Sequence, residues 1–347
     1  MKLIKKLLPI LILLILGMAG YFGYQLFIVP QMVKLPVPTE IPFYTVSYIY
    51  YLKPTSLSSY SFGSEQISAS DLGNVVLKDM KDIKSAGFGG IKLGYNFKTN
   101  NYIQNRVALK AAQVGLYPIG MLTGDNIKPK ERAFDDKEMT EWESFVRDEV
   151  RANKNYIYFW EVWNEPSNDM FRYGSAEEYV TLLKHTSSII KQENPSAKII
   201  ATLDFEANTN NNDFSDKVLS LGGNYFDFVS FHPYSANPYL REDAFKAAVN
   251  KEEQLLAKYG NKWGLIISEI GQPTSEVSEE EQARLGKIVY QEAIGRNIPL
   301  TWLHYSDRRL LEGALIGDGM NWGLIRTDGT PRPLYETIKE LIRSNPR

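Results

Sequence analysis

The stretch Phe159-Trp-Glu-Val-Trp-Asn-Glu-Pro166 joins a hydrophobic run to a carboxylate and then to a proline. Pro166 has no backbone N–H to give to a sheet, so it marks the end of strand pairing, with Glu165 just before it. Side chains of a regular strand alternate between faces, so Asn164 and Glu165 can share a pocket only if the strand bulges or twists as it ends. The stretch predicts either a carboxylate that faces a pocket or an ordinary strand that ends in a solvated glutamate.

Strand and helix patterns alternate eight times around this stretch. Strict alternation of buried, β-rich segments with helices predicts a parallel sheet, and eight units predict closure into a (β/α)8 TIM barrel. An open doubly wound sheet is the main alternative, although no Gly-x-Gly-x-x-Gly or Gly-x-x-x-x-Gly-Lys stretch stands at a strand–helix junction. A serine-rich loop is expected after the first strand. The predicted strands are residues 44–50, 90–94, 116–121, 156–164, 198–203, 226–231, 263–268 and 300–304.

The composition excludes some kinds of partner. The 347 residues carry a formal net charge of −2, which leaves no broad basic surface and argues against nucleic acid as a partner. The absence of cysteine excludes disulfides and thiolate metal sites. The three histidines show no His-x-x-x-His or similar spacing, so we predict neither a metal site nor a cofactor.

The first residues predict a membrane segment. Lysines at positions 2, 5 and 6 precede an uncharged run over residues 7–29, whose roughly 23 residues would span about 35 Å as a helix. By the positive-inside rule the chain after this run lies outside the cytoplasm. We predict a signal-anchor at residues 1–29, a proline-rich extended spacer at 30–42 and the folded domain at 43–347. A cleavable signal peptide is the alternative, since Gly17 and Ala19 suit a small-residue cleavage site.

Polar residues gather where the predicted strands end. In a TIM barrel the carboxyl ends of the strands form one mouth, where substrates bind. The fourth and seventh strands each deliver a glutamate, Glu165 and Glu269, nearly opposite each other across such a mouth. Paired carboxylates of this kind are what glycoside hydrolysis requires, because one protonates the leaving oxygen and the other attacks the anomeric carbon or activates water. The further residues at these strand ends are Asn164, His232, Tyr234 and Trp302.

The motifs resemble those of a known enzyme group. The segment Glu161-Val-Trp-Asn-Glu-Pro166 resembles the acid/base motif of clan A glycoside hydrolases, most closely family 39 and next family 5. Ile267-Ser-Glu-Ile-Gly271 is similar to their nucleophile strand, and Phe231-His-Pro-Tyr234 to their sixth-strand signature. The segment from Trp322 to Tyr335 resembles their last loop and helix. The resemblance covers roughly residues 43–345, although the first three strands match only in pattern.

The resemblance implies an enzyme that hydrolyses glycosidic bonds of a carbohydrate with retention, with Glu165 as general acid and then base and Glu269 as nucleophile. It implies substrate contacts through four residues, of which Asn164 binds the sugar 2-hydroxyl and Trp302 stacks on a sugar face. It also implies a non-proline cis peptide after Trp302. The expected location is the bacterial cell membrane, with secretion as the alternative. The remaining two substrate residues are His232 and Tyr234, and Tyr234 is expected to hold Glu269.

Other readings stay open. Transglycosylation uses the same covalent intermediate, and a carbohydrate-binding barrel without turnover is the alternative outside enzymology. Glu161 is expected to form an ion pair with Lys92 inside the barrel rather than to act in catalysis. Two departures from family 5 stand out, because no histidine precedes residue 185 and Lys92 replaces the usual second-strand arginine. Surface or loop roles compete with sugar contacts for Asp204, Arg308 and Arg309.

Overall fold

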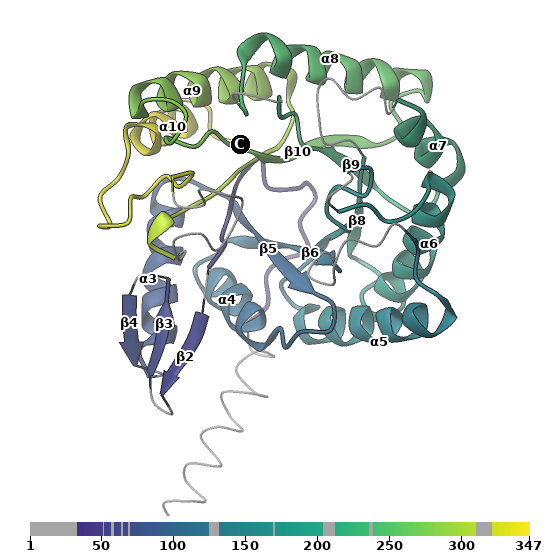
Figure 1. Cartoon of the computed structure of the whole chain (residues 1–347), viewed down its shortest axis with the longest axis horizontal. Coiled ribbons are helices and arrows are strands. Elements are labelled where there is room, and N and C mark those ends of the chain that lie inside the picture. Colours follow the sequence, from purple (N-terminus) through teal and green to yellow (C-terminus); the bar gives the residue numbers. More distant parts are fainter. Residues whose placement is uncertain are drawn as a thin grey trace, which may run out of the picture.

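The computed structural model of the chain describes residues 33–50, 52–56, 59–63, 65–68, 70–124, 132–168, 171–203, 212–235, 239–309 and 321–347. Within these stretches, eight parallel strands close into a barrel, because β1 pairs with both β11 and β5. Closure confirms the (β/α)8 prediction and excludes the open sheet (Figure 1). The barrel strands are β1 (Tyr44–Ser47), β5 (Gly90–Asn96), β6 (Tyr117–Thr123), β7 (Phe159–Val162), β8 (Lys198–Thr202), β9 (Phe228–Phe231), β10 (Gly264–Ile270) and β11 (Leu300–Trp302).

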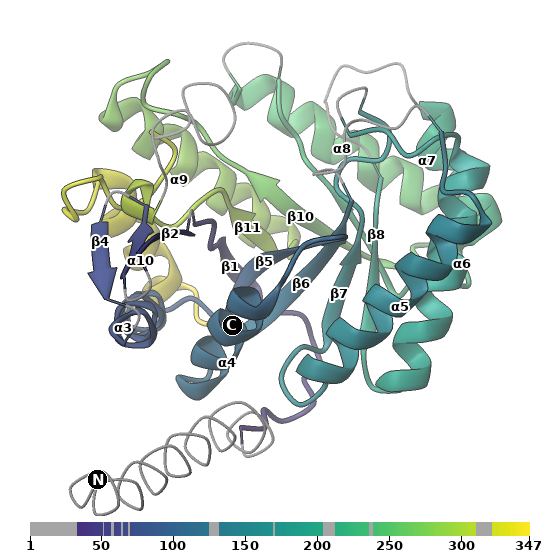
Figure 2. The ribbon, with the colours of Figure 1, turned by 60° about the horizontal axis from the view of Figure 1, so that its bottom comes forward.

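Helices surround the strands and bury the core between the two layers (Figure 2). N-terminal capping residues determine where two of the helices begin. Asp135 and Ser175 each accept a hydrogen bond from the backbone of a glutamate three residues later, which closes a capping box. The helices are α3 (Leu72–Ser85), α4 (Tyr102–Gln113), α5 (Asp136–Asn153), α6 (Ala176–Glu193), α7 (Asn212–Gly222), α8 (Glu242–Lys258), α9 (Glu279–Arg296) and α10 (Pro333–Ser344).

The barrel interior is polar below the mouth. Lys92 on β5 lies 2.6 Å from the Glu161 carboxylate on β7, and both side chains are almost fully buried. This confirms the predicted ion pair. Hydroxyl groups of Thr202 and Ser230 also donate to Glu161, at 3.2 and 2.7 Å. A buried charge that is paired and hydrogen-bonded in this way is tolerated in a barrel interior.

A small antiparallel sheet replaces the predicted serine-rich loop. Its strands are β2 (Leu52–Ser56), β3 (Ser59–Phe62) and β4 (Glu65–Ser68). Hydrophobic residues set among the serines give the segment a face that can be buried, and Phe62 is fully buried. Arg309 fixes this sheet against α3, because its guanidinium group bonds both Asp79 and Glu65. Arg308 also pairs with Glu65, so both arginines serve the fold here.

The described part of the predicted spacer is packed against the barrel. Leu35 is 8% exposed, its backbone N–H donates to the Asn155 carbonyl, and its own carbonyl accepts from the hydroxyl of Tyr158, the residue before β7. Ile41 is also buried. We call residues 33–42 the floor strap, since they run beneath the N-terminal ends of the strands. The described part of the predicted extended spacer at 30–42 thus packs on the folded domain, because two apolar residues among its prolines are buried.

The predicted anchor at residues 1–29 lies outside the described residues. Among the helices that the structure describes, none has the length and apolar composition needed to cross a membrane.

Candidate active site

The chain leaves strand geometry before it reaches Glu165. Strand β7 ends at Val162, and both Trp163 and Glu165 have left-handed backbone conformations, with φ of 67° and 46°. Such angles cost energy for residues other than glycine and persist only where the surroundings hold them. The Trp163 ring supplies one such hold, because its Nε1 donates to the Phe171 carbonyl at 2.7 Å. The predicted distortion at the strand end is confirmed.

Glu165 is held on both carboxylate oxygens. Oε1 lies 2.6 Å from Nδ1 of His232, and Oε2 accepts from the Asn168 side chain at 2.8 Å. The side chain is 2% exposed. The bland alternative of a solvated glutamate is therefore wrong, because strand β9 brings an imidazole against this carboxylate.

His232 is a neutral link between two strands. Burial lowers its pKa to about 4, so the ring is uncharged near neutral pH. When the Glu165 carboxylate is ionised, Nδ1–H of the neutral ring donates to it, and Nε2 accepts from the Ser268 hydroxyl at 3.0 Å. This fixes the imidazole between Glu165 and β10. His232 thus contacts the carboxylate directly, which sequence spacing did not predict.

Glu269 faces Glu165 from strand β10. Tyr234 donates its hydroxyl to Oε1 of Glu269 at 3.3 Å, as the resemblance implied. Burial raises the pKa of Glu269, and the nearby Glu165 carboxylate acts in the same direction. The pKa of Tyr234 is raised well above its usual value by burial, so this hydroxyl stays protonated and remains a donor.

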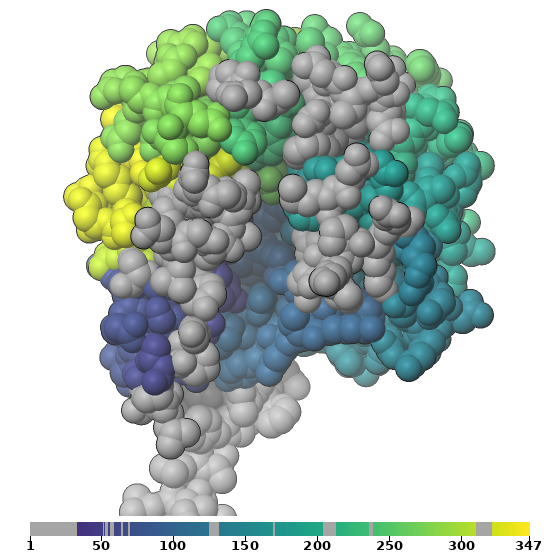
Figure 3. All heavy atoms as spheres, in the orientation of Figure 1, coloured from purple at the N-terminus to yellow at the C-terminus, as the bar shows by residue number. Residues whose placement is uncertain are grey.

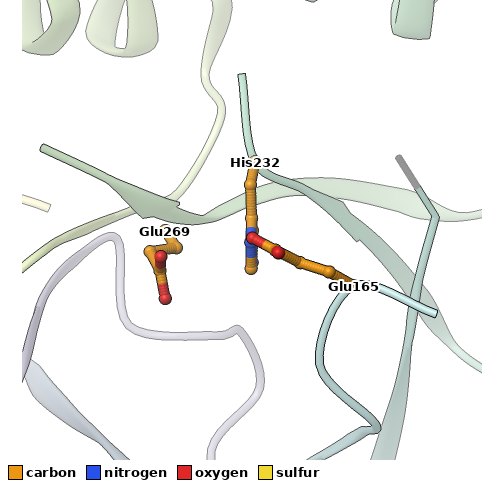
Figure 4. A group of neighbouring side chains, drawn as sticks. All are labelled: Glu165, His232 and Glu269. Atoms are coloured by element: carbon orange, nitrogen blue, oxygen red, sulfur yellow. The ribbon is translucent and has the colours of Figure 1, made fainter. Parts of the chain in front are cut away.

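The three groups converge. One ligating atom from each of Glu165, His232 and Glu269 lies within 4.8 Å of the other two. Figure 4 shows Glu269 and Glu165 approaching from opposite sides, with the His232 ring against the Glu165 carboxylate. The space-filling view is hollowed near its centre, with atoms of the blue strand region at the bottom of the recess (Figure 3). Two carboxylates and an imidazole are a donor set that could hold a cation, but both His232 nitrogens already have hydrogen-bond partners.

The side-chain oxygen of Asn164 is an unsatisfied hydrogen-bond acceptor among the described residues. Its Oδ1 is buried and has no hydrogen-bond partner among the described residues. A buried amide oxygen is costly to leave unbonded. Its place beside Glu165 suits a hydroxyl group of a bound ligand.

The prediction that Trp302 stacks on a sugar is wrong. Strand register pairs Ser47 with Lys92, which points into the barrel, and pairs Val46 with Trp302. Alternation therefore turns Val46 and Trp302 outward. The Trp302 ring is fully buried beside Tyr290 of α9, with 6.3 Å between ring centroids.

The predicted position of the cis peptide is wrong by one residue. Within the described chain the non-proline cis bond joins Leu303 to His304 rather than Trp302 to Leu303.

Sequence reasoning missed several residues near the site. Ser268 and Asn168 each stand within three residues of a predicted glutamate, and that proximity is the signal that could have found them. The Trp322 ring contacts Tyr239 and Tyr234, at centroid distances of 4.9 and 6.2 Å, although its long-loop position gave no indication of this. Asp204 lies outside the described residues.

Comparison with known proteins shows that several solved structures have a fold similar to that of this chain. No protein-family model and no curated protein matches the sequence. The structure resembles a family 39 glycoside hydrolase from the gut symbiont Bacteroides cellulosilyticus WH2, with a TM-score of 0.62 and 17% identity over 86% of this chain and 62% of that chain. It resembles xylanase 10B from Thermotoga maritima, with a TM-score of 0.62 and 16% identity over 87% of this chain and 95% of that chain.

A third similar structure is GH5_18 from Streptomyces cattleya in complex with GlcNAc, with a TM-score of 0.61 and 14% identity over 78% of this chain and 74% of that chain. Glycoside hydrolases of families 39 and 5 are thus among the structures with this fold, in agreement with the sequence motifs. The chain spans only 62% of the family 39 structure and 63% of a glucosidase from Croceicoccus marinus. At these identities the likeness establishes the fold alone.

Proposed function

We propose that this protein is a glycoside hydrolase that cleaves O-glycosidic bonds of an oligosaccharide or polysaccharide with retention of configuration. The observation that carries the proposal is that one carboxylate oxygen of Glu165 and one of Glu269 lie within 4.8 Å of each other. Retaining enzymes place their two carboxyl groups about 5–5.5 Å apart, whereas inverting enzymes leave about 6.5–9.5 Å for a water molecule. The short separation supports retention.

The proposed reaction has two displacements. In the first, Glu269 attacks the anomeric carbon while Glu165 gives its proton to the leaving oxygen, so the glycosidic bond breaks and a glycosyl ester of Glu269 forms. In the second, Glu165 takes a proton from water, the water oxygen attacks the anomeric carbon, and the ester bond breaks to release Glu269. Each proton that Glu165 gives is regained from the water.

The neighbours of the two glutamates suit these roles. His232 and Asn168 fix the Glu165 carboxylate, and Tyr234 fixes Glu269. Asn164 brings a buried oxygen that has no partner among the described residues, which fits the sugar 2-hydroxyl that such enzymes bind more strongly in the transition state. No step requires a metal ion, so chelation with EDTA is expected to leave turnover unchanged.

The test begins with a panel of 4-nitrophenyl glycosides and polysaccharides. We expect release of nitrophenol or of shortened chains, and the first product seen by ¹H NMR is expected to keep the anomeric configuration of the substrate. Inversion would contradict the two-step mechanism. Lengthened sugars in the mass spectrum would favour a transglycosylase, and binding without any product after long incubation would favour a carbohydrate-binding barrel.

We also propose that residues 1–29 anchor the protein in a bacterial cell membrane, with the barrel outside the cytoplasm. The uncharged run over residues 7–29 and the lysines before it support this proposal. Cell fractionation with alkaline carbonate extraction tests it. Recovery of a shortened protein in the medium would instead indicate secretion after cleavage.

A further inference from the structure

Strand β10 is irregular where it delivers Glu269. Its register with β11 runs from Ile267 opposite Leu300 to Ile270 opposite Trp302, so β10 advances three residues while β11 advances two. On its other side, the pairing of β10 with β9 ends at Ile267. An extra residue on one strand is a β-bulge, and such bulges redirect side chains near active sites. The bulge contains Ser268 and Glu269.

Without this bulge Glu269 would point away from the mouth. Ser230 points into the barrel, because its hydroxyl donates to Glu161, and its register partner on β10 is Ile266. Ser268 follows by two residues and also points inward, onto His232. Regular alternation would then direct Glu269 outward to the helices. Its contact with Tyr234 shows that the bulge turns it toward the mouth instead.

A buried cation holds this bulge from inside the barrel. Nζ of Lys92 donates to the Ser268 carbonyl oxygen at 3.1 Å, and the same Nζ lies 2.6 Å from Glu161. Lys92 is 4% exposed and Glu161 is fully buried, so bulk water solvates neither charged group. The contact passes through the barrel interior and joins a side chain of β5 to the backbone of β10, two strands that are separated in the closed sheet by β1 and β11.

We propose that Lys92, neutralised by Glu161, is a positioning residue that holds the β10 bulge so that Glu269 faces Glu165. Lys92 stands in place of the second-strand arginine that family 5 usually has, and here its Nζ contacts the carbonyl of the residue before Glu269. The catalytic consequence rests on the proposed function, but the placement of Glu269 does not. A misplacement of about 1 Å in a reacting group can cost about 100-fold in rate.

The test uses the full barrel with both charges removed. The double variant Lys92→Met/Glu161→Gln removes the donor to the Ser268 carbonyl and leaves no unpaired charge. We expect it to fold by circular dichroism, its crystal structure to show the Glu269 carboxylate displaced from Glu165, and kcat on a 4-nitrophenyl glycoside to fall about 100-fold with KM nearly unchanged. Glu269 in its original place with wild-type kcat would overturn the proposal.

Two further variants separate positioning from stability. Ser230→Ala removes a hydrogen bond to Glu161 but leaves the Lys92 contact with Ser268, so it is the matched control and should keep the placement of Glu269. The second variant, Lys92→Leu/Glu161→Gln, also removes the donor to the Ser268 carbonyl without leaving an unpaired charge. If Lys92→Met/Glu161→Gln does not fold, this variant carries the test, and Glu269 in its original place with wild-type kcat there would overturn the proposal. If the wild-type protein hydrolyses no glycoside, the proposed function fails, while the crystal structures still decide the role of Lys92.

Discussion

Nδ1 of His232 lies 2.6 Å from Oε1 of Glu165, although 67 residues separate them in the chain. A neutral imidazole that donates to one strand end and accepts from Ser268 on another joins β7, β9 and β10 at the mouth. The ring therefore fixes the position of the proposed acid/base residue without itself exchanging protons near neutral pH. This division of roles can be tested residue by residue.

The charge state of His232 is the first prediction. Because burial lowers its pKa to about 4, we expect ¹⁵N NMR of the imidazole to show a neutral ring, protonated on Nδ1, from pH 8 down to about pH 4. The His232→Gln variant assigns the signal by its loss. Titration between pH 6 and 7 would show that the ring is charged when the site works.

Replacement of Glu269 should separate activity from stability. Loss of the nucleophile in Glu269→Gln is expected to reduce kcat on the order of 10⁴- to 10⁶-fold. The pKa of Glu269 is raised in the folded state, so the ionised group opposes folding at pH 7, and this cost disappears below the unfolded pKa, where both states are protonated. Urea denaturation should therefore show a more stable variant at pH 7, with the gain shrinking toward acid pH. Wild-type turnover in this variant would refute the assignment.

Tyr234→Phe tests the support of Glu269. Loss of the hydroxyl removes a hydrogen bond to the ionised carboxylate, so the pKa of Glu269 should rise further. The acid limb of the pH profile of kcat/KM is expected to move to higher pH, with kcat/KM lowered about tenfold at pH 5, and the fold should be retained. An unchanged acid limb would mean that the 3.3 Å contact is too weak to matter.

Trp302 and Trp322 should differ in their effects. Trp302→Phe alters a fully buried contact with Tyr290, so we expect a loss of about 0.5–3 kcal/mol in the free energy of unfolding and an unchanged KM. Trp322→Ala removes the ring beside Tyr234 and Tyr239 and should raise KM. Steady-state kinetics and urea denaturation of both variants provide the comparison. A raised KM in Trp302→Phe alone would restore the original prediction for this residue.

The floor strap should contribute to stability. Leu35 is 8% exposed, so Leu35→Ala is expected to lower the free energy of unfolding by about 2–5 kcal/mol. Val37, which is 52% exposed in the same strap, is the matched control. Val37→Ala should change the free energy of unfolding by about 0.5 kcal/mol or less. Equal effects in urea denaturation would show that the strap is a spacer after all.

The order of strands and helices followed from the sequence because hydrophobic periodicity is local. Alternating buried strands and amphipathic helices predicted the barrel, and the predicted strands at 198–203 and 300–304 coincide with β8 and β11 to within two residues. The small sheet from Leu52 to Ser68 was missed, because its burial depends on Arg309, more than 240 residues away from Glu65. Propensity alone could not reveal that partner.

The sequence by itself determined the eight-fold alternation, the two glutamates at strand ends, and the ion pair of Lys92 with Glu161, since each depends on alternation along a single strand or on the order of elements. Only the tertiary structure decided which way a side chain turns where a strand becomes irregular. The left-handed backbone at Glu165 and the bulge at Ser268–Glu269 bring the carboxylates together, while the regular register of β11 turns Trp302 away. The physical reason is that the backbone breaks from regular geometry where contacts from distant strands compensate its cost, and those contacts exist only in the folded barrel.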